Sequence, residues 1–427
     1  MVKIREGSLM NKITDSILPA DHAISAEMLG IRGLVSMILK AGWRYRRTVW
    51  YLLKKRGIKA VYNFFYTKIF VPTGEGSGEL AYYFIGPLIR RFPRLAPYPS
   101  YIEIEITTRC NKKCIMCEHT YWKESIDNIS YEEFIQLADQ FPNLRWINLT
   151  GEGEPFLNKD FLNILEYLTE KEVMVYFGDS FDLIDETVAK KLVDLDIAGI
   201  YVSMDAATKE TYEKIKVGCN FERSVKNIKR LVELKKAKGS PLPELCFRYI
   251  ITTLNYHEIP KFVELVRTFG NMHELGDGSK IHFIGLLVFP EIRQYYLPDI
   301  PEKIQREAIK KKEEIEDGVE VIFSHTEPKR YPSINRCLAW MEPYIMMKGY
   351  VLPCCAVMMS NNRDFLREHS FGNLFEKPFK EIWNSERYRK FRETVNKPDA
   401  KVPLLCKGCR AYDTKEREEK YGVDIEL

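Results

Sequence analysis

Between residues 101 and 289 the chain alternates short apolar runs with longer amphipathic ones, and this alternation constrains the fold more than any other feature of the sequence. Short apolar runs bounded by turn residues are typical of strands, and the longer amphipathic runs are typical of helices. Strands that alternate with helices predict an α/β fold with a parallel sheet. The expected strands are residues 101–107, 146–150, 173–179, 198–206, 244–253 and 280–289.

Three cysteines directly follow the first of these strands. Cys110, Cys114 and Cys117 lie in the run TTRCNKKCIMCEH, with the spacing C-x3-C-x2-C. Three thiolates on one short loop can hold three irons of a [4Fe–4S] cluster and leave the fourth iron open to an exchangeable ligand, whereas a closed structural site takes four protein ligands. The alternative is a zinc knuckle that takes a more distant fourth ligand, such as His119.

A glycine-rich turn follows the second expected strand. Gly151, Glu152, Gly153 and Glu154 stand there before Pro155. Glycines leave backbone carbonyls exposed, and carbonyls together with a carboxylate suit a protonated amine. Ligands gather at the carboxyl ends of strands in parallel barrels, and both the cysteine loop and this turn are expected at such ends.

A second group of cysteines lies near the C-terminus. Cys406 and Cys409 form C-x-x-C in LLCKGCR, and Cys337, Cys354 and Cys355 precede them. Cysteines in this number can hold another iron–sulfur cluster, and four of them can equally hold a structural zinc ion.

Together these motifs resemble the radical S-adenosylmethionine (SAM) superfamily, which carries C-x3-C-x2-C after its first strand and a GGEP-like turn after its second. The C-terminal cysteines resemble the SPASM/twitch extension of that superfamily, with a G-x4-C element from Gly349 to Cys354 and a "GN…IWNSE…R" run before Cys406. The resemblance covers residues 101 to about 412. It implies a partial (β/α)6 TIM-like barrel followed by an auxiliary-cluster domain.

The resemblance implies SAM and two [4Fe–4S] clusters as cofactors. The open iron of the first cluster, on Cys110, Cys114 and Cys117, would be chelated by the amino and carboxylate groups of SAM. The cysteine count supports one auxiliary cluster, as in the twitch form, with Cys355 as a spare thiol. Its implied ligands are Cys337, Cys354, Cys406 and Cys409.

The resemblance also nominates further SAM contacts. Ser203 and Asp205 end the fourth strand, where the family presents "SLDG", and Met116 stands where the family packs an apolar side chain beside adenine. Asp205 could instead cap the following helix, and a methionine in a loop is often filler. Where relatives have a "TNG" turn after the third strand, this chain has Asp179 and Ser180.

Such an enzyme would form a 5′-deoxyadenosyl radical that abstracts hydrogen from an unactivated carbon, with a one-electron reductant such as ferredoxin or flavodoxin as partner. The auxiliary cluster could accept the substrate electron, conduct electrons or bind substrate. No general base stands out, because His257 and His282 are expected to be structural histidines.

The first hundred residues differ from the rest in charge. They carry 16 Lys and Arg against 6 Asp and Glu, with no acidic residue from 28 to 74. Their basic, aromatic-rich sequence reads as helical, and such a helix can lie on an anionic membrane surface. The alternatives are an amphipathic cap packed on the barrel and a peptide- or nucleic-acid-docking patch. No recognition motif supports nucleic acid as a partner.

The remaining expectations concern organisation and location. At 45% hydrophobic and 29% charged residues the chain is globular. With no secretory leader pattern, we expect reduced cysteines, with Cys219 and Cys246 in the core. Since there is also no apolar run of eighteen residues, we expect a cytoplasmic protein, and the membrane interpretation of the basic segment would place it peripherally on the inner membrane face. Three domains are expected: a helical basic extension over residues 1–100, the barrel over 101–325 and the auxiliary-cluster domain over 326–427.

The sequence supports three hypotheses about function. The first is an enzyme that oxidises or couples a lipid, a lipid-linked sugar or another small molecule. The second is a radical SAM maturase that modifies a peptide or protein, which the helical N-terminal region makes less favoured, since such maturases often begin with a strand-rich winged-helix domain. The third is a non-catalytic interaction protein that binds zinc at both cysteine groups.

Overall fold

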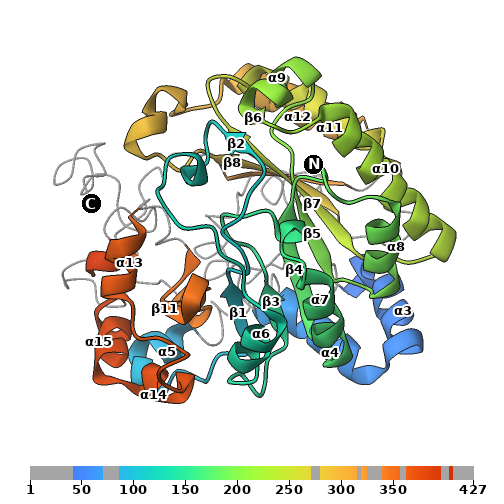
Figure 1. The fold of residues 1–427 in the computed structure, drawn as a ribbon. Coiled ribbons are helices and arrows are strands. Elements are labelled where there is room, and N and C mark those ends of the chain that lie inside the picture. The colour runs from blue at the N-terminus through green and yellow to red at the C-terminus, as the bar shows by residue number, and fades with distance from the viewer. Residues whose placement is uncertain are drawn as a thin grey trace, which may run out of the picture.

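The computed structural model describes residues 42–70, 86–270, 279–314, 319–324, 339–355, 362–395 and 403–406. They form an α/β fold whose main sheet has nine strands in the order β11-β10-β1-β3-β4-β5-β7-β8-β9. The sheet curves as a partial TIM-like barrel with helices around its outer side (Figure 1). The expected fold class is therefore confirmed.

Seven of the parallel strands in this sheet precede the C-terminal region. The first six correspond to the expected strands, each shorter than its apolar run. The seventh, β9, was not expected from the sequence, and it pairs with β8. The seven are β1 (Tyr101–Ile104), β3 (Trp146–Asn148), β4 (Met174–Asp179), β5 (Gly199–Ser203), β7 (Glu244–Ile251), β8 (Lys280–Gly285) and β9 (Glu320–Ser324).

Two of the helices that cover the outer face have clear start or stop signals in the sequence. α6 starts with a capping box between Ser130 and Glu133, and α10 ends at Gly239, whose φ of 64° lies in the left-handed region that glycine tolerates. The outer helices pack with their buried faces against the sheet to form one continuous core. They are α6 (Tyr131–Ala138), α7 (Phe161–Glu170), α8 (Glu186–Asp194), α9 (Lys209–Ile215), α10 (Phe221–Lys238), α11 (Ile259–Arg267) and α12 (Glu302–Glu313).

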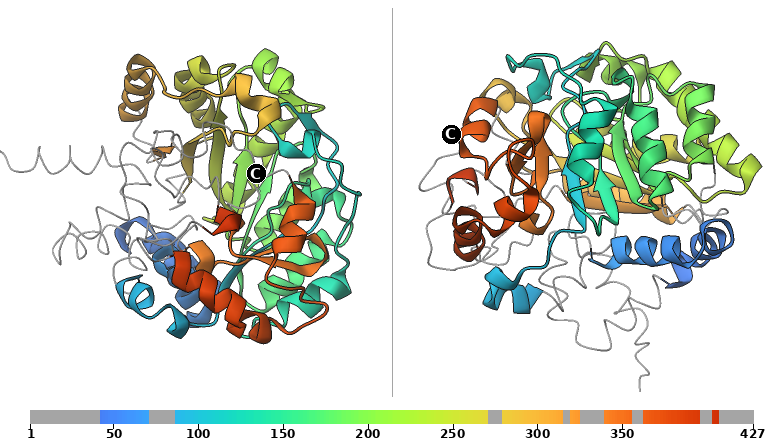
Figure 2. Two further views of the ribbon diagram at one scale, coloured as in Figure 1. Left: turned by 90° about the vertical axis from the view of Figure 1, so that its left-hand side faces the viewer. Right: turned by 60° about the horizontal axis from the view of Figure 1, so that its bottom comes forward.

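The C-terminal region extends the sheet beyond β1 rather than forming a separate body. β10 (Tyr344–Met346) pairs in parallel with β1, and β11 (Tyr350–Leu352) pairs antiparallel with β10. Three helices pack beside these strands (Figures 1 and 2). They are α13 (Arg363–His369), α14 (Phe379–Asn384) and α15 (Glu386–Val395), and the last two meet at Ser385 in the expected "GN…IWNSE…R" run.

The described part of the N-terminal region is helical, as the sequence predicts. α3 (Arg46–Arg56) and α4 (Ile58–Phe70) lie below the barrel in the right-hand view of Figure 2, and α5 (Gly86–Arg91) leads towards β1.

Two basic side chains of α3 and α4, those of Lys55 and Lys68, bond to groups near the amino ends of the strands. The Lys68 ammonium lies 3.1 Å from the Tyr176 hydroxyl and pairs with the Glu244 carboxylate. Lys55 pairs with Asp196 at 2.6 Å. These contacts support the packed-cap interpretation of the basic segment.

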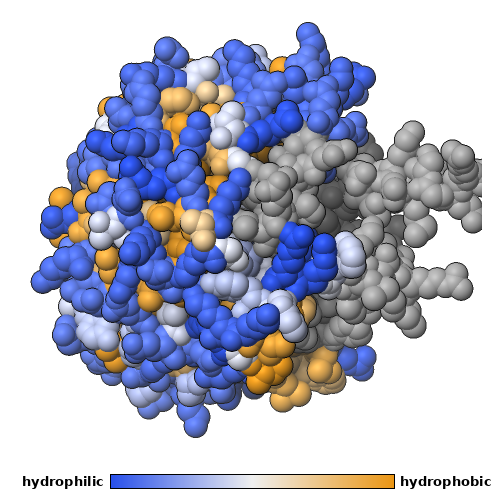
Figure 3. All heavy atoms as spheres, turned by 90° about the vertical axis from the view of Figure 1, so that its right-hand side faces the viewer, coloured by the Kyte–Doolittle hydropathy of each residue, from blue (hydrophilic) through white to orange (hydrophobic). Residues whose placement is uncertain are grey.

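Apolar side chains nevertheless stay exposed around α3, on Trp43 before the helix, on Trp50 within it and on Ile58 at the start of α4. Trp43, Trp50 and Ile58 are 70%, 59% and 73% exposed. Apolar surface also shows at the lower edge of Figure 3, on a face that is otherwise mostly hydrophilic. None of the helices among the described residues is long and apolar enough to span a membrane.

Candidate active site

The three cysteines of the C-x3-C-x2-C run lie on the loop that follows β1, at the carboxyl ends of the strands. Cys110, Cys114 and Cys117 are free, half-buried thiols. The loop is held by a small antiparallel pair in which β2 (Lys113–Cys114) joins β6 (Lys216–Val217), with Cys114 opposite Lys216. The segment after α9 therefore fixes the position of the cysteine loop.

Buried cations lie behind this loop. Burial raises the pKa of the Cys114 thiol, and the nearby Lys216 ammonium acts in the opposite direction. Lys216 also donates to the Ser203 hydroxyl at 2.7 Å and pairs with Asp205 at 2.9 Å. Lys112 opposes the effect of burial on the pKa of Cys110 in the same way. The two lysines thus favour thiolate ligands at a partly buried site.

The donor set fits a [4Fe–4S] cluster better than a zinc knuckle. The proposed fourth zinc ligand, His119, is buried and its Nε2 lies 2.8 Å from the Thr108 carbonyl oxygen. Among the described residues, no three His, Cys, Asp or Glu side chains are grouped so as to hold a single metal ion. A cluster spaces its ligands more widely, because each thiolate binds a different iron, and three cysteines leave its fourth iron open.

The GEGEP turn packs directly against the root of the cysteine loop. A Cβ on Gly151 would come 2.5 Å from the Glu105 Cγ, and one on Gly153 would come 2.4 Å from the Thr107 carbonyl oxygen. The Glu152 carboxylate lies 3.9 Å from the Cys117 Sγ. Glycine is therefore required at both positions for the turn to approach the cysteines this closely.

The second carboxylate of the turn has a buried partner. Glu154 forms an ion pair with Lys112 at 2.6 Å. Ser180 lies 3.4 Å from the same carboxylate, and burial, with the Glu154 charge as a further cause, raises the pKa of Asp179 well above its usual range. Asp179 and Ser180, where this chain departs from "TNG", therefore pack against the GEGEP turn.

Asp205 does not cap α9. Its carboxylate accepts a bond from the Ile250 amide at 2.7 Å and pairs with Lys216. The N-cap of α9 is Thr208, whose amide donates to the distant Glu258 carboxylate at 3.1 Å. The helix-cap interpretation of Asp205 is thus wrong, and its carboxylate instead links β5 to β7 and to the support of the cysteine loop.

Met116 is half-buried in an apolar cluster at the carboxyl end of β8. It packs with Leu286, Phe289 and Ile292. The cluster adjoins the cysteine loop, which makes it a candidate apolar wall of the site.

Polar residues that the sequence reading missed face the barrel interior. Burial raises the pKa of Glu103 on β1, and the charge of Arg248 on β7 acts in the opposite direction. Three strands lie between the two residues, so both side chains point inward. The Arg248 guanidinium lies 3.5 Å from the centre of the Tyr201 ring. Burial, reinforced by Arg248, lowers the pKa of His282 to about 3, so this histidine stays neutral. The alternation of residues along β1 is the signal that could have identified Glu103.

The auxiliary cysteines are partly described. Cys354 is half-buried, Cys355 is exposed and Cys406 is buried, while Cys337 and Cys409 lie outside the described residues. Cys219 and Cys246 are buried, as expected of core thiols.

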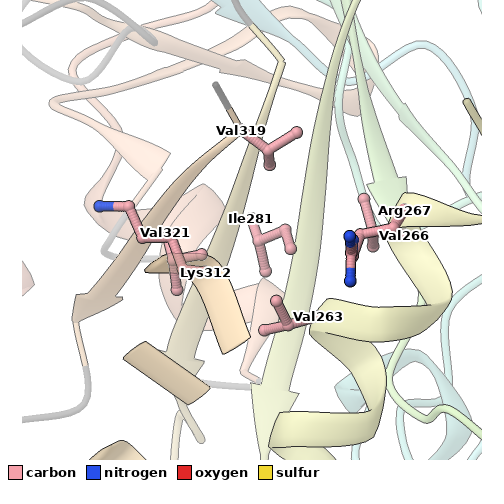
Figure 4. Close-up of a pocket in the computed structure, with 7 residues that line it drawn as sticks. All are labelled: Val263, Val266, Arg267, Ile281, Lys312, Val319 and Val321. Carbon is pink, nitrogen blue, oxygen red and sulfur yellow. The ribbon is translucent and has the colours of Figure 1, made fainter. Parts of the chain in front are cut away.

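A small hollow on the outer face of the sheet is separate from this site. It lies between α11 and α12 over β8 and β9, and Ile281 of β8 points into it (Figure 4). The residues around it are Val263, Val266, Arg267, Ile281, Lys312, Val319 and Val321.

Comparison with known families decides between an iron–sulfur enzyme and a zinc-binding protein. Residues 104–266 match the Radical SAM superfamily, and residues 337–410 match SPASM, an iron–sulfur cluster-binding domain. The chain belongs to the radical SAM superfamily. It is a radical SAM enzyme with a SPASM domain, and its cofactors are SAM, the radical SAM [4Fe–4S] cluster and an auxiliary iron–sulfur cluster.

This radical SAM protein is similar to several curated proteins. The tungsten-containing aldehyde ferredoxin oxidoreductase cofactor-modifying protein of Pyrococcus furiosus is 26% identical over 324 residues, covering 68% of this chain and 83% of the relative. The probable GTP 3′,8-cyclase of Methanocaldococcus jannaschii is 24% identical over 59% of this chain and 84% of the relative. Mycofactocin maturase MftC of Mycobacterium tuberculosis is 25% identical over 43% of this chain and 46% of the relative.

Among solved structures, the fold is similar to that of SuiB from Streptococcus suis. The structure of SuiB bound to SAM has a TM-score of 0.58 and 15% identity, covering 85% of this chain and 90% of SuiB. The structure of SuiB bound to the precursor peptide SuiA has a TM-score of 0.56 and 14% identity, covering 78% of this chain and 74% of SuiB.

Proposed function

We propose that this radical SAM protein is a maturase that modifies a carbon centre in a peptide or protein. The observation that carries the proposal is the likeness to SuiB, which extends from the barrel into the C-terminal region and includes a structure with a precursor peptide. The similarity to a mycofactocin maturase supports it further. Among our expectations this was an alternative, and the comparisons favour it over a lipid or lipid-linked substrate.

In this proposal Cys110, Cys114 and Cys117 hold the cluster that binds SAM. When bound, the cluster and SAM supply a 5′-deoxyadenosyl radical that abstracts hydrogen from carbon. The barrel excludes water and holds the target carbon close. A ferredoxin or flavodoxin would supply the electron. The residues proposed to contact SAM are Gly151, Glu152, Gly153, Glu154, Ser203, Asp205 and Met116, and those proposed to hold the auxiliary cluster are Cys337, Cys354, Cys406 and Cys409.

A small-molecule substrate is the second candidate. The relatives include a probable GTP 3′,8-cyclase and a cofactor-modifying protein, and the polar barrel interior around Glu103 and Arg248 suits a polar compound. A lipid substrate is less favoured, because the pairs of Lys55 and Lys68 with barrel carboxylates fix the basic segment at the end of the barrel opposite the cysteine loop. A membrane that contacts this segment would therefore be far from the proposed SAM site.

Transfer of deuterium to 5′-deoxyadenosine distinguishes the two candidates. Reconstituted protein, unlabelled SAM and a reductant would be mixed anaerobically with extract of source cells grown on deuterated medium and divided by a size filter. We expect singly deuterated 5′-deoxyadenosine with the macromolecular fraction, and its loss when that fraction is first treated with protease. Transfer from the small-molecule fraction that survives protease would contradict the maturase proposal and favour the second candidate.

We also propose that α3 attaches the protein peripherally to an anionic membrane surface. Within α3, Arg46, Trp50 and Lys54 recur every four residues, so they share one helical face, and Trp43 lies just before the helix. Arg46 lies 4.0 Å over the Trp43 ring and Lys54 lies 4.7 Å over the Trp50 ring. Neither α3 nor α4 contains an acidic residue. Aromatic rings and cations on one face suit the headgroup region of a bilayer.

Co-sedimentation with phosphatidylserine-containing vesicles tests this attachment. Binding should fall steeply with salt, because the screening length shrinks from about 10 Å at 0.1 M to about 3 Å at 1 M. The Trp43→Ala, Trp50→Ala variant should lose the part of binding that resists salt, and Leu95→Ala, which removes an exposed side chain elsewhere, should not. If vesicle binding changes neither with salt nor in the tryptophan variant, the membrane proposal is wrong and α3 is only a cap packed on the barrel.

A further inference from the structure

The helix α13 lies between the two cysteine groups, and it belongs to the C-terminal region. Its first residue, Arg363, is buried and reaches the carboxyl end of β1. The Arg363 guanidinium donates to both oxygens of Glu105, one of them at 3.1 Å. The two side chains are 3% and 0% exposed. Arg363 Nε also lies 3.5 Å from Glu124, on the loop that follows the cysteines.

Glu105 in turn supports the GEGEP turn. Its carboxylate accepts a second bond from the C-terminal region, from the Met347 amide at 2.8 Å. Its Cγ fills the place that a Cβ on Gly151 would occupy. Any shift of the Glu105 side chain would therefore change the packing surface under Gly151 and the position of the GEGEP turn.

Further residues of α13 pack near one of the auxiliary cysteines, Cys354. Leu366 lies in a small core with Phe365, Cys354 and Leu405, the last being the neighbour of Cys406. A second arginine of the helix, Arg367, holds both oxygens of Glu124 at 2.8 and 2.9 Å. The helix thus joins the surroundings of the auxiliary cysteines to the loop and turn that form the proposed SAM site.

We propose that Arg363 is a positioning residue for SAM binding. It holds Glu105 under the GEGEP turn and so makes the geometry of the SAM site depend on the auxiliary-cluster region. This inference rests on the proposed contact between that turn and SAM. Residues one layer behind a metal site commonly affect affinity by about 10- to 100-fold, because they orient the groups that touch the ligand.

Steady-state kinetics of Arg363→Met test the proposal. We expect the KM for SAM in reductive cleavage to rise about 10- to 100-fold while iron content and kcat at saturating SAM stay near the wild-type values. Arg363→Lys should recover only part of the affinity, since an ammonium cannot bond Glu105 and Glu124 in the fixed fork of a guanidinium. Arg387→Gln, which removes a bond to the His369 carbonyl in the same region, serves as the matched control and should leave the KM unchanged.

Removal of Arg363 alone leaves the Glu105 carboxylate buried without its cation, which could unfold the protein. The double variant Arg363→Met, Glu105→Gln avoids this, because it removes both charges. In this variant too the KM for SAM should rise. A second readout is the change that SAM causes in the electron paramagnetic resonance spectrum of the reduced cluster, which should require higher SAM in both variants. If the folded, iron-loaded double variant has the same KM for SAM as the wild-type protein, the proposed role of Arg363 is wrong. A wild-type protein that neither cleaves SAM nor shows this spectral change would instead contradict the proposed function.

Discussion

The variant in which Cys110, Cys114 and Cys117 are all alanine should form no 5′-deoxyadenosine and should lose about half of its iron. Two [4Fe–4S] clusters amount to about eight irons per chain, and the three cysteines are the proposed ligands of one of them. Without that cluster no electron reaches the sulfonium of SAM. Iron analysis and chromatography of the nucleoside products, both on anaerobically reconstituted protein, measure the two effects.

The auxiliary cysteines provide the matched comparison. Cys406→Ala with Cys409→Ala should remove the other half of the iron while leaving some reductive cleavage of SAM. Replacing the spare thiol, Cys355, should leave the iron content unchanged. Full activity of the triple variant would mean that the catalytic cluster is assigned to the wrong cysteines, and zinc in place of iron at the second site would favour the structural alternative.

The parts of the site that depend on local sequence were predictable. A short loop after a strand must keep its cysteines together, so the spacing of Cys110, Cys114 and Cys117 was enough to nominate them. The glycines of the GEGEP turn were equally visible, although the sequence did not reveal why they are required. The reason is the closeness of Glu105 and the Thr107 carbonyl, which only the folded chain brings to Gly151 and Gly153.

Contacts between distant residues were not predictable from patterns. Asp205 stands at a plausible cap position before α9, yet the group that bonds the Thr208 amide there is Glu258, which is 50 residues away. A local sequence motif predicts hydrogen bonds only between residues that are near one another in the sequence. The link from Arg363 to Glu105 was missed for the same reason, since it spans 258 residues.

The basic N-terminal segment shows how charge counts can mislead. The sequence contains no acidic residue from 28 to 74, which made a solvent- or membrane-facing surface attractive. The structure supplies the missing carboxylates from the barrel, where Asp196, Glu172 and Glu244 meet lysines of α3 and α4. Net charge over a segment therefore says little about which of its side chains are free.

Replacement of Lys68 by methionine should destabilise the fold by about 3–5 kcal/mol, because it leaves the Glu244 carboxylate buried without its cation. Lys68 and Glu244 are 4% and 5% exposed, and the Tyr176 hydroxyl bonds to both. Burial by itself would lower the pKa of Lys68, and the Glu244 charge outweighs it, so the net shift is upward and the lysine is charged. Urea unfolding followed by circular dichroism measures the loss.

A lysine on the same helix provides the control for this effect. Lys59 pairs with Glu172 at 3.0 Å, but the two side chains are 65% and 23% exposed, so Lys59→Met should cost no more than about 1 kcal/mol. The double variant Lys68→Met, Glu244→Leu should recover most of the lost stability, because the buried charge is then gone and apolar side chains fill the space. Equal losses at Lys59 and Lys68 would show that α4 is held by its apolar face alone, and that the ion pair at the base of the barrel contributes little.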